Sequence, residues 1–175
     1  MLEEVVRVQG GVEQALAAML LARAAEAHRL AAWILRDPIG AEDAVQEAAL
    51  QAWNKRSSLR DLDSMDGWFT RIVVNVCRDE LRARARKRDL PTPDALIESR
   101  ADRFAERDEL SRAVGRLSPD EQVVLALRFG RDFSVPQIAD QLGIPQGTVK
   151  SRLHHSLDHL RAALAAERRP EEATR

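Results

Sequence analysis

Tyrosine is absent from this chain, and cysteine occurs once, as Cys77. A single thiol can form neither an internal disulfide nor a cysteine-based zinc cluster. Cys77 follows Val76 and stands close to Val73 and Val74, so we expect a buried structural thiol rather than a reactive sensor. The lack of tyrosine also excludes enzymes that cut DNA with a tyrosine nucleophile.

Long apolar runs are also missing, and no run reaches the length needed to span a membrane. The first residues, MLEEVVRVQGG, lack the basic start and apolar stretch of a signal peptide. We therefore expect a cytoplasmic protein without membrane insertion. The formal net charge is only −1, so binding to nucleic acid has to rest on local basic patches.

The 175 residues suffice for one medium domain or two small ones, and 45% of them are apolar, which allows a core. Alanine, leucine, arginine and glutamate dominate the sequence, and these residues favour helix. β-Branched residues do not alternate over any useful length, as a half-buried strand requires. We predict an all-α fold of two small helical domains joined by a flexible linker.

Three helices are expected in the first domain. Apolar residues at helical spacing predict residues 12–36 as one long helix or two short ones. The segment around Pro38 ends this helix, because proline lacks an N–H and disfavours helix before itself. A second helix is expected from about residue 41 to residue 53, and a third from about residue 65 to residue 88.

The boundary between the domains is predicted from turn-forming residues. Pro91 and Pro93 lie in a stretch, 89–99, that breaks the helical pattern. We therefore assign residues 1–90 to the N-terminal domain, 91–110 to the linker and 111–175 to the C-terminal domain.

The sequence of the C-terminal domain contains residues that mark where helices begin and end. Ser118 with Glu121, and Ser134 with Gln137, have the spacing of capping boxes. Gly143 stands where a left-handed helix cap is expected, and a tight turn then leads into another helix. Two short helices joined in this way form a helix-turn-helix. Its core is predicted to contain Ile138, Ala139, Leu142, Ile144, Val149 and Leu153.

The second helix of this motif carries polar and basic residues opposite its apolar stripe. In DNA-binding members of this motif, the start of the second helix enters the major groove, and Lys150, Ser151, His154 and His155 stand there. A helical hairpin with a merely solvated outer face is the alternative. His155 and His159 have the spacing of a metal pair, but no third ligand is evident, so no metal is expected.

Charge is unevenly distributed over the N-terminal domain. Residues 71–90 contain seven basic and three acidic side chains, whereas residues 42–66 contain six acidic and three basic ones. The net charge is therefore close to zero because a basic patch and an acidic patch nearly cancel. The basic patch suits phosphate groups, and the acidic patch is either solvated or faces a basic protein partner.

Three segments carry a family resemblance. AEDAVQEAALQAW, from Ala41, resembles the second conserved block of bacterial sigma factors of the extracytoplasmic-function class. DGWFTRIVVNVCRDELRARARKR, from Asp66, resembles the promoter-melting segment of that family. LSPDEQVVLALRFGRDFSVPQIADQLGIPQGTVKSRLHHSLDHLR, from Leu117, resembles its promoter-reading domain. The three segments stand in the order of the family and cover most of the chain.

The resemblance implies a factor that binds core RNA polymerase and supplies promoter recognition. Its polymerase-binding residues would be Asp43, Gln46 and Glu47, and the loop 58–63 would capture an unstacked base. Residues facing the minus-ten element would be Arg71, Asn75 and Arg78, with Trp68 and Phe69 as candidates for stacking, although the spacing of Trp68 favours the core. Residues at the minus-thirty-five element would be Thr148, Lys150, Ser151, Arg152, His154 and His155.

Promoter DNA and an anti-sigma factor are further partners that the resemblance implies, and no cofactor is expected. A stand-alone helix-turn-helix regulator acting without core polymerase is the alternative, but it has no need of the block that begins at Ala41. A DNA-processing enzyme would require a nucleophile or a metal-binding acidic cluster. The sequence has no tyrosine nucleophile and no Gly-rich phosphate loop, and its acidic residues lie on helical faces typical of a surface. The protein is therefore not expected to be an enzyme.

Overall fold

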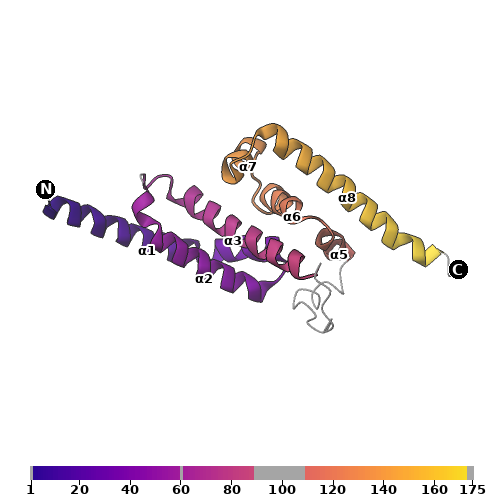
Figure 1. Cartoon of the computed structure of the whole chain (residues 1–175), viewed down its shortest axis with the longest axis horizontal. Coiled ribbons are helices and arrows are strands. Elements are labelled where there is room, and N and C mark those ends of the chain that lie inside the picture. Colours follow the sequence, from indigo (N-terminus) through magenta and orange to yellow (C-terminus); the bar gives the residue numbers. More distant parts are fainter. Residues whose placement is uncertain (1, 60, 89–108, 173–175) are drawn as a thin grey trace.

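The computed structural model describes residues 2–59, 61–88 and 109–172, and the secondary structure in these ranges is helical (Figure 1). The all-α prediction is thus confirmed. The predicted linker at 91–110 falls mainly outside the described residues. The elements are α1 (Leu2–Leu35), α2 (Pro38–Asn54), η1 (Arg56–Ser58), α3 (Met65–Arg88), α5 (Glu109–Gly115), α6 (Pro119–Leu125), η2 (Ala126–Gly130), α7 (Val135–Leu142) and α8 (Gln146–Glu172).

The first two helices differ from their predicted limits. α1 is a single helix that begins at Leu2, well before the predicted start at residue 12. α2 begins at Pro38 rather than at residue 41. The proline occupies the first helical turn, where a missing N–H costs no hydrogen bond. The chain turns between the two helices at Arg36, whose φ is 54°.

Helices α1, α2 and α3 form the N-terminal bundle. The buried residues of α2 are all alanines, namely Ala41, Ala44, Ala48 and Ala52, and Val45 packs at the edge of the core. Such a face lets the neighbouring helices approach closely. α3 supplies the larger groups, including Phe69, Ile72, Val73, Val74, Cys77 and Leu81, all of them buried.

The C-terminal helices begin at the predicted caps. The Ser118 backbone N–H donates to Glu121 Oε2 at 2.9 Å, and Ser118 Oγ accepts from the Glu121 N–H at 3.4 Å. Ser134 and Gln137 form the equivalent pair at the start of α7. α6 continues into η2, a π-helical turn that ends at Gly130 as expected.

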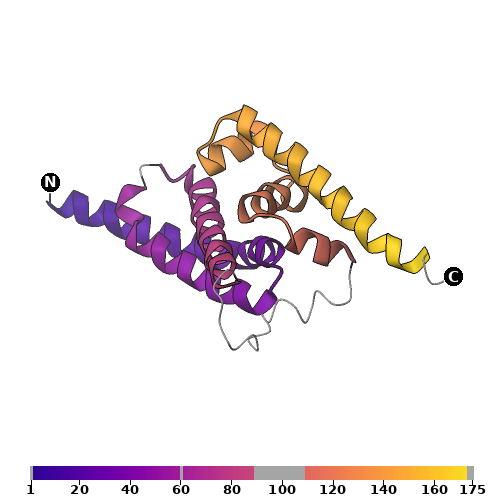
Figure 2. The same cartoon turned by 45° about the vertical axis from the view of Figure 1, so that its right-hand side comes forward.

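The N-terminal bundle and the C-terminal helices pack against each other. α1 contacts η2, and α3 contacts both α6 and α7. Gly130 lies so close to α1 that a Cβ atom on it would be 3.3 Å from Trp33 Cδ2. Residues from both parts, among them Ile34, Val73, Leu127 and Ile138, belong to one hydrophobic cluster. Figure 2 shows α6 and α7 between α3 and the long α8.

Candidate nucleic-acid interface and acidic groove

α7 and α8 form the predicted helix-turn-helix. Gly143 has a φ of 63°, the left-handed conformation that glycine adopts without strain. The Ile144 N–H then donates to the Ala139 carbonyl at 3.1 Å and closes the turn. Ile138, Ala139 and Val149 are buried between the helices, and the other predicted core members pack against them. The predicted core is thus confirmed.

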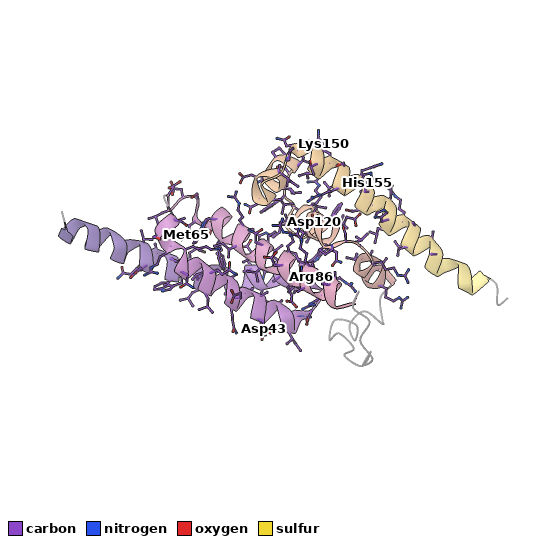
Figure 3. The ribbon with its side chains drawn as sticks, viewed as in Figure 1. Asp43, Met65, Arg86, Asp120, Lys150 and His155 are labelled. Atoms are coloured by element: carbon purple, nitrogen blue, oxygen red, sulfur yellow. The ribbon has the colours of Figure 1, made fainter. Side chains whose placement is uncertain are left out.

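The start of α8 presents a polar outer face. Lys150, Ser151, His154 and His155 are exposed, and Lys150 and His155 lie along the outer side of the helix in Figure 3. Ser151 Oγ donates to the Thr148 carbonyl at 3.0 Å. The rings of His154 and His155 are 5.9 Å apart. Four of the six residues predicted for the minus-thirty-five element are therefore gathered on one accessible surface.

Thr148 and Arg152 are placed differently from these four. Both are half-buried. Arg152 turns toward α6, where its Nη2 lies 3.1 Å from Asp120 Oδ2. Ser156, one turn further along α8, is fully buried and donates to the Arg152 carbonyl at 2.6 Å. Sequence reasoning missed Ser156 because a polar residue among leucines gives no signal of burial.

The residues predicted for the minus-ten element lie along one side of α3 and are all half-buried. Arg71 Nη2 donates to the Asp140 carbonyl at 2.9 Å and to its Oδ2 at 3.0 Å. Arg78 Nη2 donates to Asn75 Oδ1 at 3.1 Å. Arg71 is therefore held by α7, whereas Asn75 and Arg78 are paired with each other.

The two aromatic residues at the start of α3 belong to the core. Trp68 packs against the hydrophobic cluster, as its spacing predicts. Phe69 is only 3% exposed. The candidate role of Phe69 in stacking on a base is therefore wrong for this arrangement, because a stacking platform must present a ring face to the nucleic acid.

An acidic groove of about 530 Å³ lies along the junction of α2 with the second half of α3. Asp43 and Glu47 line it from α2, and Asp79 and Glu80 line it from α3. Gln46 is exposed on α2 but does not line the groove. Asp79 and Glu80 were not predicted, because they stand inside the basic segment of the sequence and only helix packing brings them to the acidic side.

An ion pair forms part of the groove wall. Arg84 Nη2 lies 3.1 Å from Asp37 Oδ2, and its Nε lies 2.8 Å from Glu80 Oε1. Asp37 and Arg84 are largely buried, with side chains only 10% and 20% exposed. Loss of either partner would leave a poorly hydrated charge, which is strongly unfavourable. Arg84 thus holds the junction between α1 and α2 against α3.

Cys77 lies beneath this groove wall with no exposed surface. Burial raises the pKa of its thiol to about 12, although the charge of Arg84 acts in the opposite direction. The thiolate is the reactive form of cysteine. The expected structural role of Cys77 is therefore confirmed.

No group of three or more potential metal ligands occurs within the described ranges. His159, half of the possible metal pair, instead has its Nδ1 2.7 Å from Glu121 Oε1. Among the described helices, none combines the length and apolar character required to traverse a bilayer.

Comparison with known proteins gives matches to both halves of the chain. Residues 20–87 match the family model Sigma-70 region 2, and residues 113–162 match the model Sigma-70, region 4. The RNA polymerase sigma-E factor of Streptomyces antibioticus is 32% identical over 134 residues, which is 75% of this chain and 74% of that protein. The ECF RNA polymerase sigma factor SigL of Mycobacterium tuberculosis is 33% identical over 144 residues, which is 78% of this chain and 81% of that protein.

A solved structure shares the fold. The sigma factor RpoE from Bartonella quintana, crystallised with the anti-sigma factor NepR, aligns with a TM-score of 0.56 over 91% of this chain and 97% of its own, at 21% identity. The two family models match the segments that form the bundle with the acidic groove and the helix-turn-helix with its polar face. The chain is therefore a member of the extracytoplasmic-function (ECF) class of sigma factors, the non-enzymatic subunits that direct RNA polymerase to promoters.

Proposed function

We propose that this sigma factor docks on core RNA polymerase through the acidic groove and contacts two promoter elements through α3 and α8. The observation that supports this division is the separation of the surfaces. Asp43 of the groove and Lys150 of α8 lie at opposite sides of the molecule in Figure 3. One face can therefore hold the polymerase while the other meets DNA.

The polymerase-binding residues in this proposal are Asp43, Gln46 and Glu47. All three are exposed on α2. Asp79 and Glu80 add two carboxylates on the opposite wall of the groove, so the groove suits a basic segment of the polymerase. Complementary charge of this kind directs association and excludes wrong partners.

The minus-thirty-five element is assigned to Thr148, Lys150, Ser151, Arg152, His154 and His155. Ser151, His154 and His155 offer hydrogen-bonding groups suited to base edges in the major groove. Lys150, together with Thr148 and Arg152 beside it, suits the phosphates, which position a protein on DNA without reading sequence. Ser151, His154 and His155 are exposed in the free chain, which supports their assignment to base edges.

The minus-ten element is assigned to Arg71, Asn75 and Arg78 on α3. The Asn75 side chain can form directional hydrogen bonds to a base edge, and the two arginines suit the adjacent phosphates. Residues 1–90, 91–110 and 111–175 would then act as the minus-ten domain, the linker and the minus-thirty-five domain. Joining two weak DNA contacts in one chain raises the effective concentration of the second.

An anti-sigma factor is a further expected partner. The Bartonella quintana relative is bound to one in its crystal structure, and a similar protein could regulate this chain by covering its polymerase or DNA surfaces. Polymerase and promoter DNA both lie in the cytoplasm of bacteria, so the chain is proposed to act there.

The test is transcription with core RNA polymerase from the organism that carries this chain. The chain should direct initiation at specific genomic promoters, and Glu47→Lys should weaken binding to the core enzyme. Glu42→Lys makes the same charge change on α2 outside the groove and serves as the control. If Glu47→Lys and Glu42→Lys weaken binding to the core enzyme equally, the groove is not the docking site. If no promoter-dependent transcript is made, the proposed function is refuted.

A further inference from the structure

One of the histidines proposed to meet a base edge is held by a carboxylate on the same helix. His154 Nε2 lies 3.2 Å from Oδ2 of Asp158, which stands one turn further along α8. The other oxygen of Asp158, Oδ1, accepts from Arg161 Nη1 at 2.7 Å. Both oxygens of Asp158 are therefore engaged, and the carboxylate is fixed between a guanidinium group and the imidazole.

This contact decides which ring nitrogen of His154 carries the hydrogen. A carboxylate only accepts hydrogen bonds, so the nitrogen that faces it, Nε2, is the donor. In a neutral imidazole the second nitrogen, Nδ1, is then an acceptor. Nδ1 has no hydrogen-bond partner among the described residues, and the His154 side chain is 73% exposed. His154 therefore offers an approaching molecule an accessible acceptor, while its donor is occupied.

Base edges in the major groove differ in whether they donate or accept at this site. Adenine and cytosine present an amino group, which donates, whereas guanine and thymine present a keto oxygen, which accepts. An acceptor such as Nδ1 can bond only the amino group. Because every base pair carries one group of each kind, the choice separates adenine and cytosine from guanine and thymine at one position of one strand.

The neighbouring His155 lacks this restriction. The residue one turn beyond it is His159, whose Nδ1 is itself paired with Glu121 Oε1 at 2.7 Å. Among the described residues, no carboxylate pairs with His155, whose ring lies 5.9 Å from that of His154. Either nitrogen of His155 can therefore carry the hydrogen. The two adjacent histidines thus differ in what they can recognise, although they are the same type of residue.

We propose that Asp158 determines specificity through His154: it occupies the Nε2–H donor and leaves Nδ1 to accept from the amino group of adenine or cytosine in the minus-thirty-five element. Asp158 is a positioning residue in this role, because it touches the imidazole and not the base. Without Asp158, the ring is free to turn and present Nε2–H, which bonds the keto oxygen of guanine or thymine. This inference rests on the proposed contact of α8 with that element.

The experiment is selection by the holoenzyme from a promoter library randomised at the minus-thirty-five element, at about pH 8, where imidazole groups are neutral. His154→Ala identifies the base pair that His154 reads, because the preference there is lost. At this position the wild type should favour adenine and cytosine over guanine and thymine on one strand. The expected preference is about threefold to tenfold, the scale of one hydrogen bond.

Two substitutions of Asp158 separate the hydrogen bond from the charge. Asp158→Ala removes both, and it should abolish or reverse the preference at the position that His154 reads. Asp158→Asn removes the charge but keeps an oxygen that can accept from Nε2–H, so it should retain the preference. An unchanged preference in Asp158→Ala, or the same change in both variants, would overturn the role of Asp158.

The same selection distinguishes this result from a failure of the proposed function. If His154→Ala removes a base preference and Asp158→Ala does not alter it, α8 reads DNA and only the role of Asp158 is refuted. If Ser151→Ala changes the selected sequences but His154→Ala does not, α8 still reads DNA and this inference alone is refuted. If Lys150→Ala, Ser151→Ala and His154→Ala all leave promoter binding unchanged, the proposed DNA role of α8 fails, and this inference fails with it.

Discussion

The Glu121 side chain joins two helices, because its Oε1 lies 2.7 Å from His159 Nδ1 of α8 while its Oε2 caps the start of α6. Ser118 Oγ also donates to Oε2, at 2.6 Å. A residue recognised in the sequence only as a local cap is thus a tertiary contact as well. It links the start of α6 to α8 beyond the helix-turn-helix.

The ionisation of Glu121 should make stability depend on pH. Burial opposes its ionisation, but the bonds from Ser118 and His159 outweigh it and lower the pKa of Glu121. A carboxyl with a lowered pKa in the folded state stabilises the fold above its ordinary pKa, and this contribution is lost as the pH falls through the folded value. Glu121→Gln should therefore reduce the free energy of unfolding near neutral pH, and the difference from wild type should shrink between about pH 5 and pH 3.

Denaturant titrations at several pH values measure this difference. Glutamine should retain the cap, since Gln137 performs the same role at α7, so the change reports charge rather than helix loss. Glu42→Gln on the exposed face of α2 is the control. If the free energy of unfolding of Glu121→Gln differs from that of the wild type by the same amount at every pH, the charge of Glu121 contributes nothing to stability.

Truncation of Ile138 should destabilise the helix-turn-helix. Ile138 is completely buried in the cluster that α7 shares with α3 and α8. Ile138→Ala should lower the free energy of unfolding by about 2–5 kcal/mol, from lost transfer energy and a residual cavity. Ile39→Ala removes the same atoms from a residue that is 50% exposed and should cost far less. Comparable losses in thermal or chemical denaturation would contradict the packing described for α7.

Cys77 should resist thiol reagents in the folded chain. Its burial and its pKa of about 12 both suppress the thiolate. The native chain should react with a colorimetric disulfide reagent only at the rate of unfolding, and the denatured chain should react at once. Ala162→Cys places a thiol on the exposed face of α8 as an internal control. Rapid modification of Cys77 in the native chain would mean that the bundle opens readily at α3.

Substitutions on α8 should separate base contacts from phosphate contacts. Ser151→Ala and His155→Ala in the holoenzyme should change the order of preference among minus-thirty-five sequences, by about 1–3 kcal/mol at the affected base pair. Lys150→Ala should weaken binding to all sequences alike and reduce the salt dependence. Selection from a promoter library randomised at this element measures both effects. A uniform loss for Ser151→Ala and His155→Ala would reassign these residues to the phosphates.

Much of the local structure followed from short-range sequence signals. Ser118 and Ser134 predicted the starts of α6 and α7 because a cap depends on atoms only three residues away. Gly143 predicted the turn for the same reason. The start of α2 was missed by one turn, because a proline both ends one helix and begins another, and the sequence does not distinguish the two roles. Phe69 was misjudged because one apolar residue on a helix gives no indication of which neighbour covers it.

By itself, the sequence determined the helical class, the helix-turn-helix with its polar outer face, and membership of the sigma family, since all of these depend on local patterns. Only the tertiary structure brought Asp79 and Glu80 to the groove of Asp43, and Asp120 to both Arg82 and Arg152. These pairings join residues far apart in the chain. They depend on the angle and register at which helices pack, which are decided by the shared core rather than by any local pattern.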